Sequence, residues 1–134
     1  MSGVITVYDE KQHCTAKKMP QEKKVFMDCP YTGKGEEFSP TNLVEAALAG
    51  CMLLSMGTLA IRNEIDITGA EVEVNIVGSE KPPHGFASIE IVFKMPKNYT
   101  DIEKKKLERA SAACPIKHSF RPDVAISVKY NYPE

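Results

Sequence analysis

The most constraining feature of the chain is a long apolar stretch from residue 43 to 61, LVEAALAGCMLLSMGTLAI. Ser39 is a favoured helix N-cap, and Pro40 suits the first helical position. The alanines and leucines that follow favour a helix, which we expect to end near Arg62 and Asn63. A helix that is apolar on nearly all sides is usually buried on all sides. The rest of a small domain, or a second subunit, must therefore cover it.

A membrane span is the alternative interpretation of this stretch, because its length is nearly enough to cross a bilayer. However, Glu45 lies inside it, and Gly50, Ser55, Gly57 and Thr58 dilute it. No cluster of basic residues flanks either end. The half-apolar strands elsewhere in the chain also need a cover. We therefore expect a buried helix in a protein that does not enter the membrane.

Length and composition suit one globular domain that spans residues 1–134. The 18 acidic and 17 basic residues nearly cancel, so no net charge attracts the chain to nucleic acid or to an anionic membrane. The beginning of the chain, MSGVITVYDEKQ, lacks the pattern of a secretory signal. The four cysteines have no regular spacing. We expect reduced thiols in a cytoplasmic protein rather than a disulfide framework.

Apolar alternation predicts strands on both sides of the long helix. The expected strands are 3–8, 12–17, 24–29, 71–76, 87–95 and 124–130. Thr100 and Glu103 form a capping-box pattern, which predicts the start of a second helix. The resulting order, βββ-α-ββ-α-β, indicates an α+β fold.

Two cysteines belong to helical segments. Cys51 lies in the middle of the long helix, and Cys114 precedes Pro115 at the end of the second. Burial raises the pKa of a thiol, and Cys51 is too far from its helix N-terminus to benefit from the dipole. If Pro115 opens a short helical turn, Cys114 lies near its N-terminus, with His118 as a candidate base. Local electrostatics alone therefore favour Cys114 as the nucleophile.

Other sites are less well supported by the sequence. A zinc site would have to combine Cys51, Cys114 and His118 without a CxxC signature. Cys14 and Cys29 are most simply structural thiols. The loop YTGKGEEF at residues 31–38 lacks the spacing of a phosphate-binding loop, and it is either a solvated connection or a functional loop. No metal site is therefore predicted.

Two segments resemble motifs of the OsmC/Ohr family of thiol peroxidases. Residues 39–43 (SPTNL) followed by 45–52 (EAALAGCM) resemble its central-helix motif. Residues 113–116 (ACPI) followed by 117–119 (KHS) resemble its second cysteine motif. The order, the separation and the intervening strand pair also match, so the resemblance covers nearly the whole chain. It implies an intertwined homodimer in which curved antiparallel sheets wrap around central helices.

The resemblance also implies a reaction. Cys51 would be the peroxidatic thiol that attacks an organic hydroperoxide, and Cys114 would be the resolving thiol. An external dithiol, such as a lipoylated protein, would reduce the resulting disulfide. Leu48, Met52 and Ser55 are expected to line an apolar substrate pocket, from their helical neighbourhood. No motif for nicotinamide, flavin or haem is present, so no cofactor is expected.

The chain departs from the family pattern beside Cys51. The family has an arginine before the helix, held by an acidic residue in the first helical turn. Here no arginine precedes Arg62, and Asn42 stands at the acidic position. Lys34 is a candidate replacement for the arginine, and Glu45 lies nearly a turn further along, but lysine cannot form a bidentate clamp. A second function class therefore stays open: a weakly active or non-catalytic dimer that binds an apolar ligand or senses oxidant.

Overall fold

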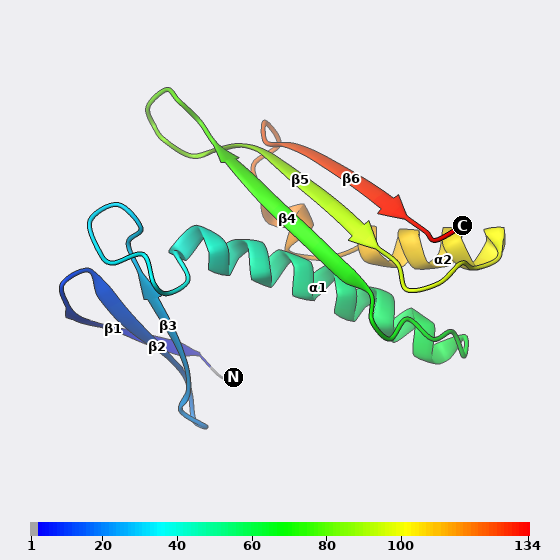
Figure 1. Cartoon of the computed structure of the whole chain (residues 1–134), viewed down its shortest axis with the longest axis horizontal. Helices are drawn as coiled ribbons and strands as arrows, with labels where there is room; N and C mark the ends of the chain where they lie inside the picture. The colour runs from blue at the N-terminus through cyan, green and yellow to red at the C-terminus, as the bar shows by residue number, and fades with distance from the viewer. Residues whose placement is uncertain (1–2) are drawn as a thin grey trace. The chain divides into compact units, whose positions relative to one another are not determined.

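The structure, a computed structural model, describes residues 3–134 and has the predicted order βββ-α-ββ-α-β (Figure 1). The strands are β1 (Val4–Glu10), β2 (His13–Lys18), β3 (Lys23–Asp28), β4 (Glu71–Gly78), β5 (Phe86–Lys94) and β6 (Ala125–Asn131). The helices are α1 (Pro40–Arg62), α2 (Asp101–Ala112) and a short 3-10 helix, η1 (Lys117–Ser119). The chain forms two compact units, with the boundary after Val44, and the single domain over residues 1–134 stays a prediction. Each unit is described by itself.

The first unit contains an antiparallel sheet of order β1-β2-β3. The β1–β2 hairpin turns at Lys11 and Gln12, which have φ values of 48° and 66°. Such positive φ values are typical of tight hairpin turns. Every residue of β1 is exposed, including the apolar side chains of Val4 and Val7. This sheet therefore leaves apolar surface without cover inside its own unit.

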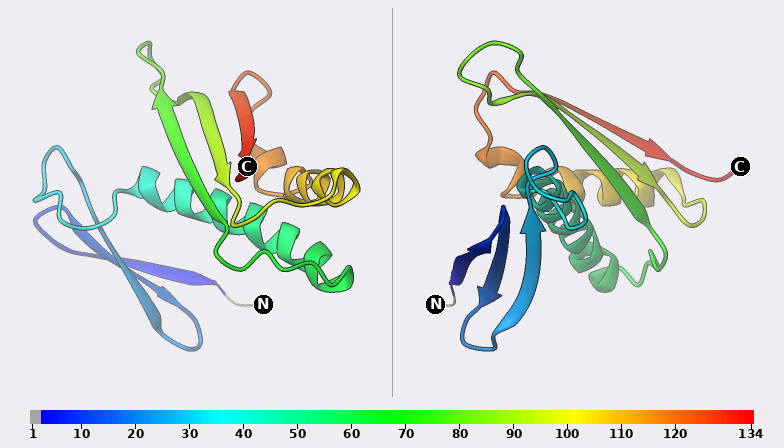
Figure 2. Two further views of the ribbon diagram at one scale, coloured as in Figure 1. Left: turned by 45° about the vertical axis from the view of Figure 1, so that its right-hand side comes forward. Right: turned by 60° about the vertical axis from the view of Figure 1, so that its left-hand side comes forward.

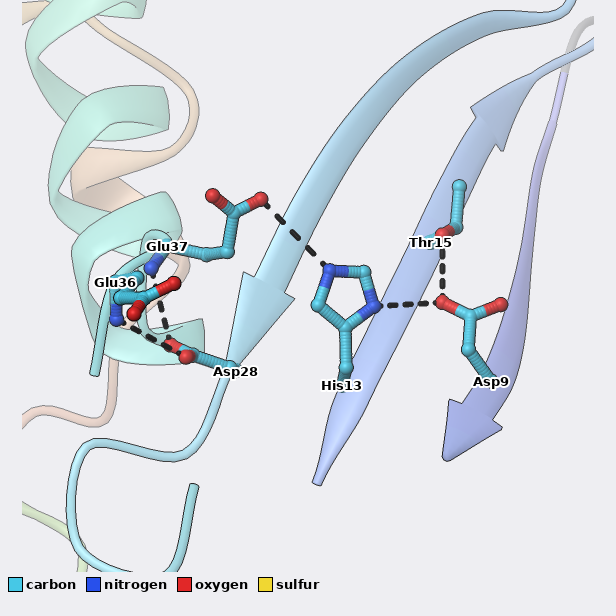
Figure 3. A network of polar contacts seen from close by, with 6 residues as sticks. All are labelled: Asp9, His13, Thr15, Asp28, Glu36 and Glu37. Atoms are coloured by element: carbon cyan, nitrogen blue, oxygen red, sulfur yellow. Dashed lines mark hydrogen bonds and ion pairs between the residues drawn. The ribbon is translucent and has the colours of Figure 1, made fainter. Parts of the chain in front are cut away.

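A buried carboxylate holds the loop that follows β3. Asp28 is 6% exposed and accepts hydrogen bonds from the N–H groups of Glu36 at 3.1 Å and Glu37 at 3.3 Å (Figure 3). Met27 and Phe38 form an isolated parallel bridge beside it. A buried carboxylate must be hydrogen-bonded to be stable. Asp28 therefore fixes the far end of the loop at residues 29–38 against the end of β3.

His13 joins this loop to the hairpin. Its ring lies between two carboxylates, with Nδ1 2.7 Å from Asp9 and Nε2 3.8 Å from Glu37 (Figure 3). The Thr15 hydroxyl donates to the same Asp9 oxygen at 2.7 Å. Both contacts hold the pKa of the Asp9 carboxyl group below its usual value. The hydrogen bond from Thr15 has the largest effect, and that with His13 has the next largest.

Helix α1 has the bounds that the sequence predicted. The Ser39 hydroxyl accepts from the Asn42 N–H at 3.0 Å, and the Asn42 side-chain oxygen accepts from the Ser39 N–H at 3.0 Å. This reciprocal cap satisfies donors that have no partner inside the helix. Among residues 3–134, α1 is the one helix whose length and composition would suffice to cross a membrane, a test that core helices of soluble proteins also pass.

The second unit is built on a sheet of order β4-β5-β6, with α1 and α2 packed on one face (Figures 1 and 2). Strands β4 and β5 are antiparallel, as predicted, whereas β6 runs parallel to β5. The parallel pairing was not predicted; it follows from the crossover through α2 and η1, since parallel neighbours need a long connection. The core consists of Leu48, Met52, Met56, Ala60, Val74, Ile89, Ile91, Phe93, Met95, Leu107 and Cys114.

Capping and tyrosine contacts anchor α2. The predicted capping box is present, because Thr100 Oγ1 accepts from the Glu103 N–H at 3.2 Å and Glu103 Oε1 accepts from the Thr100 N–H at 3.0 Å. At the other end of the helix, the Tyr130 and Tyr132 hydroxyls both donate to Glu108, the first to its carbonyl at 3.2 Å and the second to its carboxylate at 2.6 Å. These bonds tie β6, and the residues directly after it, to α2.

Candidate dithiol site

The two cysteines singled out by the sequence meet in the second unit. Cys51 lies half-buried on α1, and Cys114 lies just beyond the C-terminus of α2, fully buried at 0% exposure. Both helices pack on the same face of the sheet, which brings the end of α2 to the middle of α1. The two thiols lie close enough to influence each other's pKa, and neither forms a disulfide.

Contacts with neighbouring groups favour ionisation of Cys51. The contact with Cys114 is the largest effect, and it holds the pKa of Cys51 below its ordinary value of 9.0. Contacts with the Ile116 N–H and the Ser55 hydroxyl lower the pKa of Cys51 in the same direction, while partial burial opposes them. Because the thiolate is the nucleophile, the lowered pKa favours Cys51 over Cys114 as an attacking sulfur.

Cys114 has the opposite properties. Burial is the largest effect, and it raises the pKa of the Cys114 thiol; the hydrogen bond to Cys51 raises it further. The N–H groups of Lys117 and Ile116 oppose these effects without overcoming them. The expectation that local electrostatics favour Cys114 is therefore wrong. It took account of the helical turn after Pro115, but the sequence could not indicate that the thiol is completely excluded from water.

The segment after Cys114 is held by bonds to the end of α2. The His118 ring nitrogen Nε2 lies 3.0 Å from the Ala112 carbonyl, and the His118 N–H donates to the Cys114 carbonyl at 3.3 Å. The Ser119 hydroxyl donates to the Pro115 carbonyl at 2.8 Å. The His118 ring thus binds backbone that has no helical partner at the C-terminus of α2. These contacts position Ile116, which lines the hollow that also contains Cys51.

The other predicted supporting residues lie elsewhere. Lys34 belongs to the first unit and is exposed in the loop at residues 29–38. Asn42 participates in the cap of α1 with Ser39. Glu45 accepts a hydrogen bond from the Ile76 N–H at 2.9 Å, which ties α1 to β4, an edge strand of the second sheet. The involvement of these three residues with Cys51 stays a prediction.

An open hollow of about 480 Å³ lies beside Cys51. Its lining is formed by Ala47, Gly50, Cys51, Leu54, Ser55, Thr58 and Ile116. Of the three helix residues predicted to line a pocket, Ser55 lies here, whereas Leu48 and Met52 are both 0% exposed in the core. Leu48 and Met52 lie on the face of α1 that packs against the sheet. The lining is apolar apart from the thiol and two hydroxyl groups, and it carries no charged side chain.

Cys29 is a second thiol with a lowered pKa. Contacts from Thr32 are the main cause: its hydroxyl and its N–H, the latter 3.4 Å from the Cys29 sulfur, both bind the thiol. Gly33 is required next to it, since a Cβ atom there would lie 2.7 Å from the Cys29 carbonyl oxygen.

Cys14 is half-buried on β2. Within residues 3–134, no three His, Cys, Asp or Glu side chains are placed to hold a metal ion.

Comparisons with known proteins identify the family and the fold. Residues 33–129 match the family model described as OsmC-like protein. A search of curated proteins found no match. A crystal structure from Psychrobacter arcticus, of a protein assigned provisionally to osmotic stress induction and the detoxification response, has a TM-score of 0.90 and 29% identity and covers 98% of this chain and 96% of its own.

Two organic hydroperoxide resistance proteins share the fold at lower identity. The Legionella pneumophila protein has a TM-score of 0.72 and 15% identity, and the alignment covers 96% of each chain. The Bacillus subtilis protein OhrB has a TM-score of 0.72 and 15% identity, with 98% of each chain covered. Because the alignments cover nearly the whole of each chain, both solved structures contain counterparts of both compact units.

Proposed function

The chain belongs to the OsmC-like protein family, which includes organic hydroperoxide resistance proteins, and from this premise we propose that it is a thiol peroxidase acting through Cys51 and Cys114. One observation carries the proposal: Cys51 is half-buried beside an open hollow and Cys114, its neighbouring thiol, is fully buried, and the pKa of Cys51 is lowered whereas burial raises that of Cys114. A peroxidase needs this division between a reactive sulfur and a protected, adjacent one.

The reaction follows from the two sulfurs. The Cys51 thiolate attacks the terminal oxygen of R–O–O–H, the O–O bond breaks, and the alkoxide takes up a proton to leave as the alcohol, with Cys51 oxidised to sulfenic acid. The Cys114 sulfur then attacks the Cys51 sulfur. The S–S bond forms, and the sulfenic oxygen leaves as water with the proton that Cys114 releases. An external dithiol, for which a lipoylated protein is the candidate, reduces the disulfide by exchange and becomes oxidised itself.

The hollow beside Cys51 supports an organic substrate. Its apolar lining, which includes Ala47, Gly50 and Leu54, suits the alkyl group of a hydroperoxide. Gly50 leaves space here, because a Cβ atom at this position would meet no atom within 4 Å. We expect alkyl and aryl hydroperoxides to react faster than hydrogen peroxide, which has no apolar group to bind.

We propose a cytoplasmic homodimer in which α1 contributes to the interface. Only 22% of the most apolar window of α1 is buried, and Leu54 and Ile61 are 75% and 81% exposed. Single exposed apolar residues are common, but a helix of this composition normally has a cover on every side. A second copy of the chain would supply that cover.

The decisive experiment treats the reduced protein with one equivalent of cumene hydroperoxide and maps each cysteine by peptide mass spectrometry. We expect a Cys51–Cys114 disulfide, and in Cys114→Ser a sulfenic acid at Cys51 that dimedone traps. Because the pKa of Cys29 is also lowered, a variant with both Cys14→Ser and Cys29→Ser provides the matched control. It should behave as the parent does. A Cys51 that stays reduced under these conditions would contradict the proposal.

One observation favours the second function class, a weakly active dimer that senses oxidant. Asn42, at the acidic position of the family motif, is part of the cap of α1. Turnover separates the two classes. A peroxidase consumes many equivalents of hydroperoxide when dihydrolipoamide is supplied, whereas a sensor is oxidised once and stops.

A further inference from the structure

We propose that Tyr130 and Ser111 are positioning residues that hold the Cys114 thiol in place for its attack on Cys51. Their hydroxyl groups bind each other at the last turn of α2, and Cys114 follows directly after the end of that turn. We call this hydroxyl pair the clamp. Its part in the reaction rests on the proposed function, whereas the clamp itself does not.

The clamp is a triangle of oxygen atoms inside the second unit. The Ser111 hydroxyl is hydrogen-bonded to the Tyr130 hydroxyl, and the two lie 2.8 Å and 3.2 Å, respectively, from the Glu108 carbonyl oxygen. Whichever hydroxyl donates to the other, the carbonyl retains a donor. Ser111 is 0% exposed, so water does not compete for its hydroxyl. Such a buried bond is costly to break, because the group left behind has no substitute partner.

The sheet holds Tyr130 firmly. Tyr130 on β6 is the register partner of Phe93 on β5, and their rings are stacked with centroids 4.6 Å apart. Phe93 is fully buried in the core. Close packing of this kind leaves an aromatic ring few other positions. The Tyr130 hydroxyl therefore reaches α2 from a fixed point of the sheet.

The clamp acts on Cys114 through the backbone. The Cys114 N–H donates to the Ser111 carbonyl at 3.3 Å, and the Cys114 carbonyl accepts from the His118 N–H at 3.3 Å. Both backbone groups of Cys114 thus have partners, and the first partner is the residue whose side chain binds Tyr130. The ends of helices fray because their last carbonyls lack partners inside the helix. A clamp at this end of α2 therefore limits movement of the Cys114 sulfur.

The position of this sulfur matters for one step of the proposed cycle. Cys114 gives up its proton and attacks the Cys51 sulfur of the sulfenic acid, the S–S bond forms, and the sulfenic oxygen leaves as water. The two sulfurs must be held close together and correctly oriented for this step. We therefore expect loss of the clamp to slow disulfide formation more than it slows the oxidation of Cys51.

Tyr132 provides a matched control. It directly follows β6, and its hydroxyl also binds α2, but to the Glu108 carboxylate at 2.6 Å rather than to the last turn of the helix. Tyr130→Phe and Tyr132→Phe therefore each remove one oxygen atom and a tie between the same two segments. Only the first of them removes a contact with the residue that binds the Cys114 N–H.

The first measurement uses the reduced full chain without peroxide. Alkylation of Cys114 by N-ethylmaleimide is followed at pH 8, and peptide mass spectrometry resolves the four cysteines. We expect Tyr130→Phe and Ser111→Ala to accelerate it by about three- to tenfold, because local opening becomes easier. Tyr132→Phe should stay within about twofold of the parent. Low concentrations of urea should leave the rate in Tyr130→Phe unchanged, since local opening exposes little surface.

The second measurement follows a single turnover with one equivalent of cumene hydroperoxide. In Tyr130→Phe the Cys51–Cys114 disulfide should form about three- to tenfold more slowly, while sulfenic acid that dimedone traps accumulates at Cys51. Disulfide formation at the parent's rate would overturn the proposal. So would alkylation of Cys114 at the parent's rate, or an equal acceleration in Tyr132→Phe. If Cys51 of the parent stays reduced, the proposed function fails, and the positioning role fails with it; the alkylation rates still decide whether the clamp holds Cys114.

Discussion

The fully buried Cys114 thiol lies beside the half-buried Cys51 sulfur, and the contact between them lowers the pKa of Cys51. This contact is the largest effect on the pKa of Cys51. We expect Cys114→Ala to raise that pKa and to slow alkylation of Cys51 at pH 7 by several-fold. Cys114→Ser retains an O–H donor and should slow it less. Faster alkylation in Cys114→Ala would contradict this assignment.

Folding should also shift the pKa values of the two thiols in opposite directions. The pKa of Cys51 is lowered in the fold, so its alkylation should reach half its maximal rate at a lower pH in the native protein than in urea. The pKa of Cys114 is raised by burial, so native Cys114 should react at a higher pH than unfolded Cys114. Peptide mass spectrometry after a short alkylation pulse measures both. Identical native and unfolded profiles for Cys51 would refute this.

Two leucines on α1 should have different effects when they are shortened. Leu48 is 0% exposed in the core, and we expect Leu48→Ala to lower the free energy of unfolding by about 2–5 kcal/mol, measured by denaturant titration. Leu54 is 75% exposed. Leu54→Ala should leave the helical circular dichroism unchanged but weaken the proposed dimer by about tenfold or more in sedimentation experiments. Unchanged association in Leu54→Ala would argue against an interface at this face.

The Glu45 carboxylate should be a structural tie. It accepts the Ile76 N–H at 2.9 Å and thereby joins α1 to the edge strand β4. We expect Glu45→Ala to lower the free energy of unfolding by about 1–3 kcal/mol, because it leaves a strand donor without its partner. Glu45→Gln keeps an acceptor oxygen and should cost less than half as much. Equal losses in the two variants would show that this hydrogen bond is not the cause.

Tyr132 should make stability depend on pH in the alkaline range. Burial is the main cause that raises the pKa of Tyr132 above its ordinary value of 10.0, and the hydrogen bond to the Glu108 carboxylate is the second. Above pH 10 the unfolded chain loses this proton before the folded chain does, so the stabilisation falls as the pH rises. Tyr132→Phe should be less stable by about 1 kcal/mol at pH 7. Urea titrations should show this difference narrowing above pH 10; a widening difference would contradict the prediction.

Local patterns were enough to predict most of the fold. The Ser39 cap, the Thr100–Glu103 capping box and the alternation within β4 and β5 each depend on residues close in sequence, and the structure confirms all three. The parallel pairing of β6 with β5 could not be predicted in the same way. It depends on how α2 packs on the sheet, and that packing joins residues far apart in the chain.

The sequence singled out Cys51 and Cys114, which the structure places together in the second unit, and their roles in a reaction stay a prediction. The sequence predicted that Cys51 and Cys114 belong together, but it assigned the lower pKa to the wrong thiol, because exposure is a property of the whole packed unit. Ser55 was expected beside Cys51 from its spacing of four residues, and it lines the hollow there. That spacing places Ser55 on the same helical face, but it does not say whether the hydroxyl binds the thiol or a backbone carbonyl.

The order of the site residues along the chain has a consequence for biosynthesis. Cys114 and Ile116, two of the residues that lower the pKa of Cys51, follow the helix that carries it by more than fifty residues. On the ribosome, or in a chain whose C-terminal segment has not docked, Cys51 is an ordinary thiol that is mostly protonated at neutral pH. We therefore expect the pKa of Cys51 to fall, and its reactivity toward oxidants to rise, when the second unit is complete.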